Sequence, residues 1–536
     1  MPADLAIVGA RMRTLDPARP AATAVAIRHG AIVAVGGEAE VRAHCDARTT
    51  VIHAGGQALI PGLTDSHLHP FWGAELARGV DLSHCRTSEE VLAALAAGTV
   101  HRGWLFAWGL DYDAAPTVAE IADAVGGAAA FVRLSDLHTA LATPRALELA
   151  QIDGPRSFGD HSEVVCDEHG RPTGDLRELS AQDLVLRAAP KLRWPELRAR
   201  YVAELRRLNA LGLTGAHVMD GEPATYDLLR DLEGTDELTM RLRVPLWFGP
   251  NHTDEEMDEQ LHLRDRRGRL WRGGVVKFFA DGVIDSGTAW LSEPDTHGEG
   301  WEPFWPEPER LAAAIERFAR AGFQVATHTI GDAAVRFVLD AYVRAGAAPG
   351  VRHRLEHLEA LPDDLVAAIP AAGVVASMQP VHLAAVKAEG NWSSRLGPER
   401  AARAFRMRDL LDAGAVLALG SDWPVADADP RLGLAAAQLR RLPSQEHAVV
   451  PDQALTALEA LFGYTVAPAV AAGEDGVAGR IRVGMRADLT GLAVDPVDVA
   501  AAELPDVPVW LTIVGGRIVY DSQRSTSAGE RNLMTG

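Results

Sequence analysis

A repeated strand–helix cycle in the second half of the chain constrains the fold more than any other feature. Residues 309–322 have the apolar spacing of a helix that ends at Gly322, and residues 323–332 follow as a buried strand. The cycle recurs, with strands expected at 352–359, 374–380 and 415–425. Strands that are apolar on both faces and alternate with helices form parallel sheets. The sequence therefore predicts an α/β protein, and the length of this region suits a (β/α)8 barrel.

Both ends of the chain have a different texture, with short extended segments separated by glycine. Such segments lie at 5–12, 23–37, 49–62, 477–494 and 507–522. We expect residues 1–58 and 479–536 to pair into one small β-sandwich, and residues 59–478 to form the barrel domain. Near residues 75–200 the cycle is poorly kept and polar loops are long, which predicts an insertion in the barrel.

The composition narrows the class of partner. The chain has 536 residues and a formal net charge of −21, and a generally acidic surface repels nucleic acids and anionic membranes. The cysteines, Cys45, Cys85 and Cys166, are few and far apart, which argues against a disulfide framework and fits a reducing compartment. No apolar run approaches the roughly 20 residues of a membrane span. We expect a soluble, cytoplasmic protein that acts on a small molecule, as a monomer or a homo-oligomer.

Two histidines lie at i and i+2 in the segment 61–70. If this segment is extended, the imidazoles of His67 and His69 point the same way and reach one metal ion at a strand end. Alone, this pair is a weak indication, because most histidine pairs are solvated or hydrogen-bonded. His328, His357 and Asp422 strengthen it, since each stands at the carboxyl end of an expected strand, where barrel enzymes hold ligands and catalytic groups. Any one of these five residues could simply cap a helix or close a strand. Five such residues, all at strand ends, are much harder to explain in this way.

Lys277 is conspicuous because only three of the 52 basic residues are lysine. Its neighbours on both sides are valine and phenylalanine, and a charged ammonium is costly to bury in such a strand. A neutral amine can react with carbon dioxide and give N6-carboxylysine, whose two oxygens bridge two metal ions, and arginine cannot do this. The alternative is a lysine that reaches solvent or pairs with Asp281.

These segments resemble the amidohydrolase superfamily, and in particular its family 3 branch, which includes N-substituted formamide deformylases. The resemblance runs nearly end to end and rests on GLTDSHLHP, LGLTGAHVMD, VKFFADG, GFQVATHTIGD, RLEHLE, SMQPVHL, GSDWPV and VAGRIRVGMRADLTGL. It implies a distorted (β/α)8 TIM barrel with a small β-sandwich formed by both termini. It also implies two divalent metal ions, one bound by His67, His69 and Asp422, a second bound by His328 and His357, and carboxylated Lys277 between them.

Ligands of this kind suit zinc, and iron, manganese and cobalt are compatible with the same set. The implied activity is hydrolysis of a carbon–nitrogen bond other than a peptide bond, in an amide, N-formyl or N-acyl small molecule, by a metal-activated water. Asp422 is then the expected general base, which takes a proton from the water and passes it to the leaving nitrogen.

Less specific candidates concern the substrate site. They are His138, Asp281, Gln379 and His382, with Glu178 in a polar segment. For each of them a polar role at the surface or in the core is an equal alternative. Trp104, Trp108 and Trp290 are candidates for an apolar wall or for plain core packing.

Two other functions compete with this hypothesis. A deaminase of the same superfamily carries a glutamate just beyond the histidine of the fifth strand, but residues 329–332 after His328 read Thr-Ile-Gly-Asp. A non-catalytic barrel scaffold should have lost metal ligands, whereas all six residue types are present. Both observations favour the hydrolase.

Overall fold

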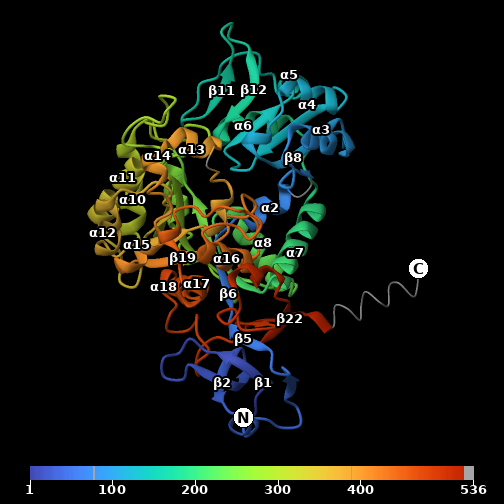
Figure 1. The fold of residues 1–536 in the computed structure, drawn as a ribbon, viewed down its shortest axis with the longest axis vertical. Coiled ribbons are helices and arrows are strands. Elements are labelled where there is room, and N and C mark those ends of the chain that lie inside the picture. Colours follow the sequence, from blue (N-terminus) through green and yellow to red (C-terminus); the bar gives the residue numbers. More distant parts are fainter. Residues whose placement is uncertain (77–78, 388, 524–536) are drawn as a thin grey trace, which may run out of the picture.

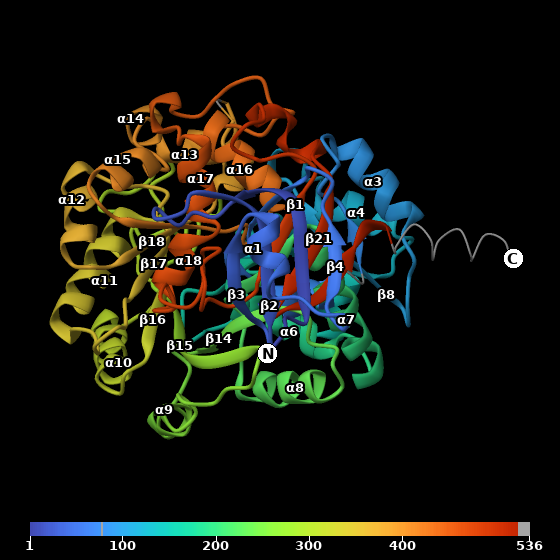
Figure 2. The same ribbon diagram turned by 90° about the horizontal axis from the view of Figure 1, so that it is seen from below.

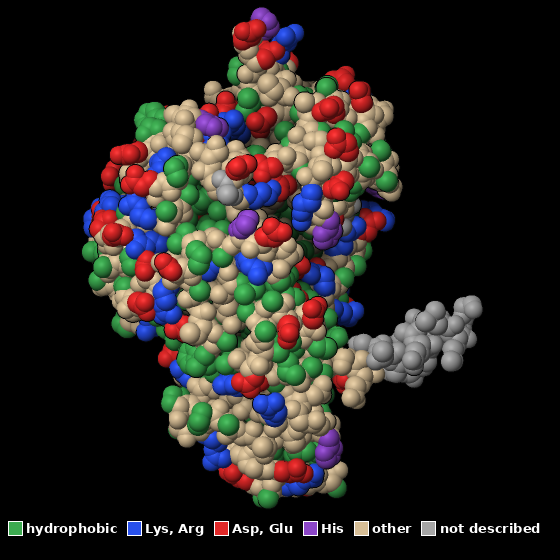
Figure 3. All heavy atoms as spheres, viewed as in Figure 1, with side chains coloured by type: hydrophobic (Ala, Val, Ile, Leu, Met, Phe, Trp, Pro, Cys, Tyr) green, Lys and Arg blue, Asp and Glu red, His purple; other side chains and the backbone are tan. Residues whose placement is uncertain are grey.

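Three layers are stacked along the long axis of the molecule: a mixed α/β layer at one end, a barrel in the middle and a sheet at the other end (Figure 1). The structure is a computed structural model that describes residues 1–76, 79–387 and 389–523. Within these ranges, no helix combines the length and the apolar character needed to cross a membrane. Figure 3 shows acidic and basic side chains interspersed over all three layers on the face drawn.

Eight parallel strands form the barrel in the described part of the chain. In sheet order they are β6 (Leu63–Leu68), β13 (Leu213–Val218), β14 (Arg241–Trp247), β15 (Trp271–Phe279), β16 (Gln324–Thr329), β17 (Arg354–His357), β18 (Val375–Met378) and β19 (Val416–Leu419). The ring closes just after β19, where the Asp422 amide donates to the His67 carbonyl at 2.7 Å and the His69 amide donates to the Trp423 carbonyl at 2.9 Å. The predicted barrel fold is confirmed.

Helices surround the barrel and bury one side against it. In α10 (Pro308–Arg320), Leu311, Ile315 and Phe318 recur at helical spacing and are buried, and the chain turns at Gly322 with a φ of 84° that suits glycine. The other helices of this layer are α2 (Pro70–Leu76), α7 (Trp194–Ala210), α8 (Pro223–Gly234), α9 (Asp254–Leu261), α11 (Asp332–Ala345), α12 (Asp363–Ala371), α13 (Asn391–Leu396), α14 (Pro398–Ala401), α15 (Met407–Asp412), α16 (Pro430–Leu439), α17 (Ala457–Gly463) and α18 (Val466–Ala471). Figure 2 shows α10, α11 and α12 at the outside of the ring.

Both ends of the chain meet in one sheet, as the predicted fold requires. Its strands are β1 (Leu5–Arg13), β2 (Ala21–Arg28), β3 (Ala31–Gly36), β4 (Thr50–His53), β5 (Ala58–Pro61), β20 (Leu489–Leu492), β21 (Val509–Val514) and β22 (Arg517–Asp521), with the short helix α1 (Glu38–Arg42) beside them. β5 joins the two ends because it pairs in parallel with β1 and antiparallel with β20. The predicted boundary at residue 58 falls on the first residue of β5, and residues 524–536 of the predicted C-terminal part lie outside the described residues.

A separate six-stranded sheet lies between β6 and β13 in the sequence, within the region where the cycle of strands and helices is poorly kept. Its sheet order is β11 (Glu163–Cys166), β12 (Pro172–Arg177), β10 (Thr139–Ala142), β9 (Ala129–Leu134), β8 (Trp104–Leu110) and β7 (Val80–Asp81), and its helices are α3 (Ser88–Ala97), α4 (Val118–Ala124), α5 (Pro144–Leu149) and α6 (Glu178–Ala188). Residues 77–78 of the predicted insertion are not described. The sheet forms the layer at the top of Figure 1, and its loops supply part of the wall of the main cavity.

Candidate metal centre

The two histidines of the first barrel strand turn toward the last one. His67 is the penultimate residue of β6 and His69 directly follows the strand. Both are buried, and their ring centroids are 5.4 Å apart. The Nε2 atoms of His67 and His69 lie 3.3 Å and 3.1 Å from the same oxygen, Oδ1 of Asp422. The segment that closes the barrel therefore places a carboxylate directly against the pair.

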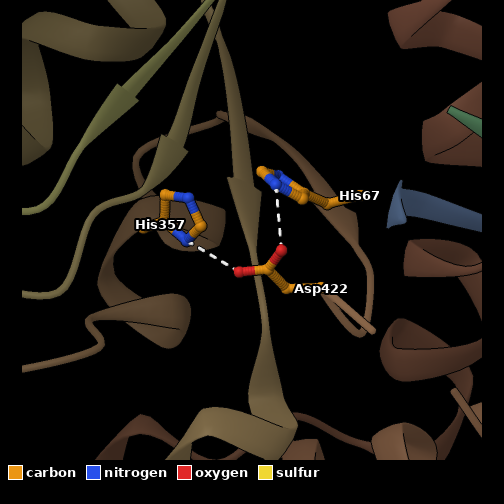
Figure 4. Close-up of side chains that lie close together, drawn as sticks. All are labelled: His67, His357 and Asp422. Carbon is orange, nitrogen blue, oxygen red and sulfur yellow. Dashed lines mark ion pairs between the residues drawn. The ribbon is translucent and has the colours of Figure 1, made fainter. Parts of the chain in front are cut away.

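His357 completes a compact group with His67 and Asp422. One ligand atom from each of these buried residues lies within 4.8 Å of the other two. Figure 4 shows the Asp422 carboxylate between the two imidazoles, with Oδ2 directed to Nδ1 of His357 at 3.8 Å. Burial lowers the pKa of His357 well below its usual range, so that its imidazole is neutral and able to bind a metal. The carboxylate keeps a pKa well below its usual range because the nearby imidazoles outweigh its burial.

His328 and Lys277 extend the group along the neighbouring strands. The ring centroids of His328 and His357 are 4.3 Å apart. Lys277 lies two residues before the end of β15. It is only 1% exposed, so its amine does not reach solvent. Burial lowers the pKa of its amine to about 8. Among the described residues, none forms a hydrogen bond with the Lys277 amine, and Asp281 does not form an ion pair with it.

Buried polar atoms without hydrogen bonds test whether a metal fits here. They are His67 Nε2, His69 Nδ1, His357 Nδ1, Lys277 Nζ and Asp422 Oδ1, which lack a hydrogen-bond partner within the described parts of the chain. Leaving buried polar atoms unpaired costs about 1–3 kcal/mol each, so a folded protein rarely gathers several. Imidazole nitrogens and a carboxylate oxygen are the donors that zinc and similar divalent ions accept. The residues present fit a divalent metal.

A second set of buried groups holds His67 in place and was not predicted. Glu356 accepts a hydrogen bond from His67 Nδ1 at 2.8 Å, and Arg354 donates to Glu356 through Nε and Nη2 at 2.5 Å and 3.0 Å. Although burial raises the pKa of Glu356, the Arg354 charge and the His67 contact bring it below the usual range. Because the proton of His67 lies on Nδ1, its Nε2 is left to face Asp422. The alternation of Arg354 and Glu356 along one strand was the available signal.

Asp65 is a further residue that the sequence reasoning missed. It is fully buried, and its carboxylate accepts from the amides of His67 at 2.9 Å and Ser421 at 3.1 Å. It therefore ties the backbone of the first ligand to the backbone next to Asp422. Burial raises its pKa to about 6. Asp65 stands two residues before His67 in the sequence, but this spacing alone does not indicate what its carboxylate contacts.

The backbone is strained at two of the candidate ligands. His357 and Asp422 have φ values of 78° and 61°, in the left-handed region that side chains other than glycine seldom adopt. Such conformations cost on the order of 1–3 kcal/mol each and persist where surrounding structure imposes them, commonly at functional sites. The strain turns both side chains toward the same point.

The group lies in a cavity of about 1090 Å³ at the carboxyl ends of the barrel strands. All six candidate ligands line it. Aromatic side chains form much of the remaining wall: Trp72, Trp108, Phe279, Trp392, Phe405 and Trp423. Of the predicted tryptophans, Trp108 lines the cavity, whereas Trp104 stacks on Phe106 and Trp290 packs on Phe337.

The tentative substrate residues divide into two pairs. His138 and His382 line the cavity, and His382 Nε2 lies 3.6 Å from Asp422 Oδ2. Asp281 and Gln379 are not among the described residues that line it. The carboxylate of Asp281 instead accepts the amides of Ile330 and Gly331, which fixes the loop after His328. Gln379 is 1% exposed and ends up beside β18 in the core.

His138 reaches the cavity from the inserted layer. Its Nδ1 donates to Glu178 Oε2 at 2.7 Å, and Glu178 Oε1 accepts from Thr288 Oγ1 of the barrel at 2.7 Å. The His138 ring centroid is 5.2 Å from that of His328. Burial alone would lower the pKa of His138, but the Glu178 carboxylate outweighs burial and raises it to about 9. The inserted layer thus supplies a cationic side chain next to a candidate ligand.

Comparison with known proteins shows which family this chain resembles. A model described as the amidohydrolase family matches residues 50–520. Protein LONG AFTER FAR-RED 3 of Arabidopsis thaliana is 30% identical, covering 97% of this chain and 92% of that protein. N-substituted formamide deformylase of Arthrobacter pascens is 29% identical, covering 97% of this chain and 98% of that protein. The solved structure of an uncharacterized metal-dependent hydrolase from Pyrococcus furiosus has a TM-score of 0.71 at 26% identity, over 92% of this chain and 99% of that chain.

The chain therefore belongs to the amidohydrolase family. It is a metal-dependent hydrolase, and the predicted class of enzyme, one that acts on carbon–nitrogen bonds other than peptide bonds, is confirmed.

Proposed function

We propose that this enzyme hydrolyses the carbon–nitrogen bond of an N-formyl or N-acyl small molecule. The observation that carries the proposal is the buried convergence of His67, His357 and Asp422 on one point at the floor of a large cavity. The similarity to a protein named N-substituted formamide deformylase over nearly the whole chain supports the choice of bond.

Two divalent metal ions, zinc in the first instance, are part of the proposal. His67, His69 and Asp422 would hold one ion, and His328 and His357 the other. Lys277, as N6-carboxylysine, would lie between them. In support, the pKa of Lys277 is lowered to about 8, so about a tenth of the amine is neutral at pH 7, far more than for an ordinary lysine. The neutral amine adds to carbon dioxide and releases one proton, which leaves a carbamate anion in place of a buried cation.

A bound divalent ion lowers the pKa of water and polarises a carbonyl oxygen. The side chains of this chain do the rest. Asp422 has a carboxylate that stays ionised, so it can accept a proton from the attacking water and deliver it to the leaving nitrogen. Glu356 keeps His67 in one tautomer and orientation through the 2.8 Å hydrogen bond. His138, held by Glu178, would donate a hydrogen bond to the substrate.

The shape of the cavity suggests the kind of substituent on the amide. A volume of about 1090 Å³ exceeds what an unsubstituted formamide needs, and the aromatic wall offers flat apolar surfaces. Trp72 and Phe279 lie within contact of the candidate ligands, since Trp72 packs edge-on against His69 and Phe279 lies against His328. We therefore propose a substrate with a bulky apolar or aromatic group on nitrogen.

The deaminase remains the second candidate, and one observation weighs against it. The residues after His328 contain no glutamate, and Asp332 at the end of that segment accepts the Ser292 amide at 2.9 Å and begins α11. That carboxylate serves the loop. A proton-transfer role in deamination would need it to face the cavity, and it is not among the described residues that line it.

A substrate panel tests the proposal. Protein loaded with zinc in the presence of bicarbonate is assayed with N-benzylformamide, N-benzylacetamide, a cyclic amide and an aminopurine, and amine or ammonia release is measured. We expect amine release from the N-formyl or N-acyl compounds, and about 10³-fold slower release with Asp422→Asn. Ammonia from the aminopurine alone would replace the proposal with the deaminase. Less than about a tenth of an equivalent of bound zinc would favour the scaffold, since ligand groups of this kind ordinarily retain their ion.

A further inference from the structure

A second cavity lies at the opposite end of the barrel from the candidate metal centre. Its volume is about 220 Å³. Its walls come from residues 214–217 of β13, from the first residues of β14 and β15, from Thr64 of β6, and from α18 and the segment that leads from it to β20. It therefore sits between the amino ends of the barrel strands and the chain entering the terminal sheet.

This cavity is strongly basic in a protein of net charge −21. Among the described residues that line it, seven are arginine and two are carboxylates. The arginines are Arg241, Arg243, Arg267, Arg269, Arg272, Arg480 and Arg486, and the carboxylates are Glu474 and Asp488. Like charges gathered at one place raise the free energy of the folded state unless anions balance them.

Both carboxylates are already engaged. Asp488 accepts from Nε and Nη2 of Arg241 at 2.8 Å and 3.1 Å, and also from the Gly515 amide. Glu474 lies 2.8 Å from Nη1 of Arg272 and also accepts from Arg486. Both carboxylates are therefore already paired with arginines of this cavity.

Three arginines remain without a carboxylate. In the described ranges no Asp or Glu oxygen forms an ion pair with Arg243, Arg267 or Arg480. Arg243 is the most informative. Its Nε donates to Gln324 Oε1 at 3.0 Å, but its Nη1 is buried and lacks a hydrogen-bond partner among those residues. Burial, together with the charge of Arg272, lowers the pKa of Arg243 to about 9, although the Glu474 charge acts in the opposite direction.

His217 adds a neutral donor to the same wall. Arg354 can only donate, so the 2.6 Å contact between Arg354 Nη1 and His217 Nδ1 makes Nδ1 the acceptor. The proton of the neutral imidazole is then on Nε2, the other nitrogen of a residue that lines the cavity. His217 therefore adds an N–H donor to the wall that already holds the unpaired Nη1 of Arg243.

We propose that this cavity binds a small oxyanion with the size and charge of a phosphate group. Guanidinium groups bind such oxyanions through paired hydrogen bonds, and a bound oxyanion would supply the missing acceptors for Arg243 and its neighbours. A water molecule takes roughly 30 Å³ of liquid, so a cavity of about 220 Å³ admits a phosphate group with at most a small substituent. Exposed Arg267 and Arg269 stand at its entrance.

The inference is independent of the proposed reaction, and its test needs no substrate. Inorganic phosphate is the probe, and binding is measured by titration calorimetry on zinc-free Asp422→Asn protein, because phosphate could otherwise bind a metal ion. We expect about one phosphate per chain, competition by sulfate but not by chloride at equal ionic strength, and at least about tenfold weaker binding in Arg243→Gln.

Arg336→Gln on α11 is the matched control, because it removes one guanidinium that forms an exposed ion pair with Asp364 of α12. It should bind phosphate as the parent does. If Arg243→Gln does not fold, Arg480→Gln takes its place, since Arg480 is partly exposed and its Nε donates to a backbone carbonyl. Absence of phosphate binding in the parent, or equal binding by parent and the Arg243 or Arg480 variant, would overturn the proposal.

Discussion

The two ends of the barrel differ in what they leave unsatisfied. At the carboxyl ends of the strands, His67, His357 and Asp422 present buried nitrogen and oxygen atoms that have no hydrogen-bond partner in the described structure. At the amino ends, Arg243 presents a buried nitrogen that can only donate, and it too is unpaired in those ranges. One end is therefore complementary to cations and the other to anions.

The number of polar side chains therefore does not distinguish the two ends of the barrel; the kind of polar atom does. Both ends are rich in ionisable side chains, but the carboxyl end gathers lone pairs and the amino end gathers N–H groups. A buried chain of hydrogen bonds joins them, from His217 through Arg354 and Glu356 to His67. The following changes test the difference, beginning with the largest expected effect.

Lys277→Ala should remove the carboxyl-end site altogether. The variant loses the group proposed to lie between two ions, so zinc content should fall and activity should drop to the background of uncatalysed hydrolysis. Short carboxylic acids such as propionate should restore part of both, because the shortened side chain leaves space for a free carboxylate. Zinc content by mass spectrometry and amine release measure the result.

Lys277→Arg and Lys191→Ala are the controls for that change. Arginine keeps the charge but forms no carbamate, so it should be as inactive as alanine and should not respond to propionate. Lys191 is exposed and should tolerate replacement. Full activity in Lys277→Ala would remove the bridging role.

Asp422→Asn should leave the barrel folded but reduce kcat by about 10³-fold, because general-base catalysis contributes roughly 10²–10⁴. The amide keeps the size of the side chain and part of its hydrogen bonding. Kinetics with the best substrate of the panel, together with circular dichroism, separate a chemical defect from a folding defect. A kcat near that of the parent would exclude Asp422 as the base.

Glu356→Gln weakens the link between the two ends and should reduce zinc affinity or kcat/KM about 10–100-fold, as is usual for groups that orient a metal ligand. Glutamine still accepts a hydrogen bond from His67 but leaves Arg354 without its charge partner. Zinc competition with a fluorescent chelator measures affinity. Glu316→Gln on α10, which removes an ion pair with Arg320, is the control; equal behaviour of the two variants would mean that Glu356 has no part in holding His67.

Asp285→Asn should change the pH dependence of stability rather than the contrast between the two ends of the barrel. Burial raises the pKa of Asp285 to about 7, well above its usual value near 3.8. Between about pH 4 and 7 the folded protein holds a proton that the unfolded chain has released, so the parent loses stability as pH rises through this window. The variant has no such loss, and its stability relative to the parent should be higher at pH 8 than at pH 4.5 by about 3 kcal/mol, which is roughly 1.4 kcal/mol for each pH unit of the window.

Urea unfolding at the two pH values measures this difference, with exposed Asp340→Asn on α11 as the control for one carboxylate fewer. A difference that stays constant with pH would show that Asp285 does not titrate in the folded protein as its burial implies.

The sequence was sufficient for the barrel and for the candidate ligands because both depend on local patterns. A buried strand after an amphipathic helix is a periodic signal, and each ligand stands where such a strand ends. Lys277 was recognised from composition, since lysine is rare in this chain. Predicting these features does not require knowing which strands are neighbours in the folded protein.

The supporting groups could not be predicted in the same way, because they depend on contacts between distant segments. Glu356 gains its meaning from His67, 289 positions away, and Asp65 from Ser421, 356 positions away. Asp281 looked like a substrate residue in the sequence, yet its carboxylate serves backbone amides. The basic cavity likewise draws its arginines from several strands and from a late segment.

The place of β5 in the terminal sheet has a consequence for how the protein is made. The partner of β5, β20, lies more than 400 residues later in the sequence, so one edge of β5 stays open until β20 has been synthesised. Contacts so distant in sequence are slow to form, and an open strand edge invites pairing with other chains. Chains truncated before residue 489 should therefore aggregate or be degraded, because β5 lacks its partner in them.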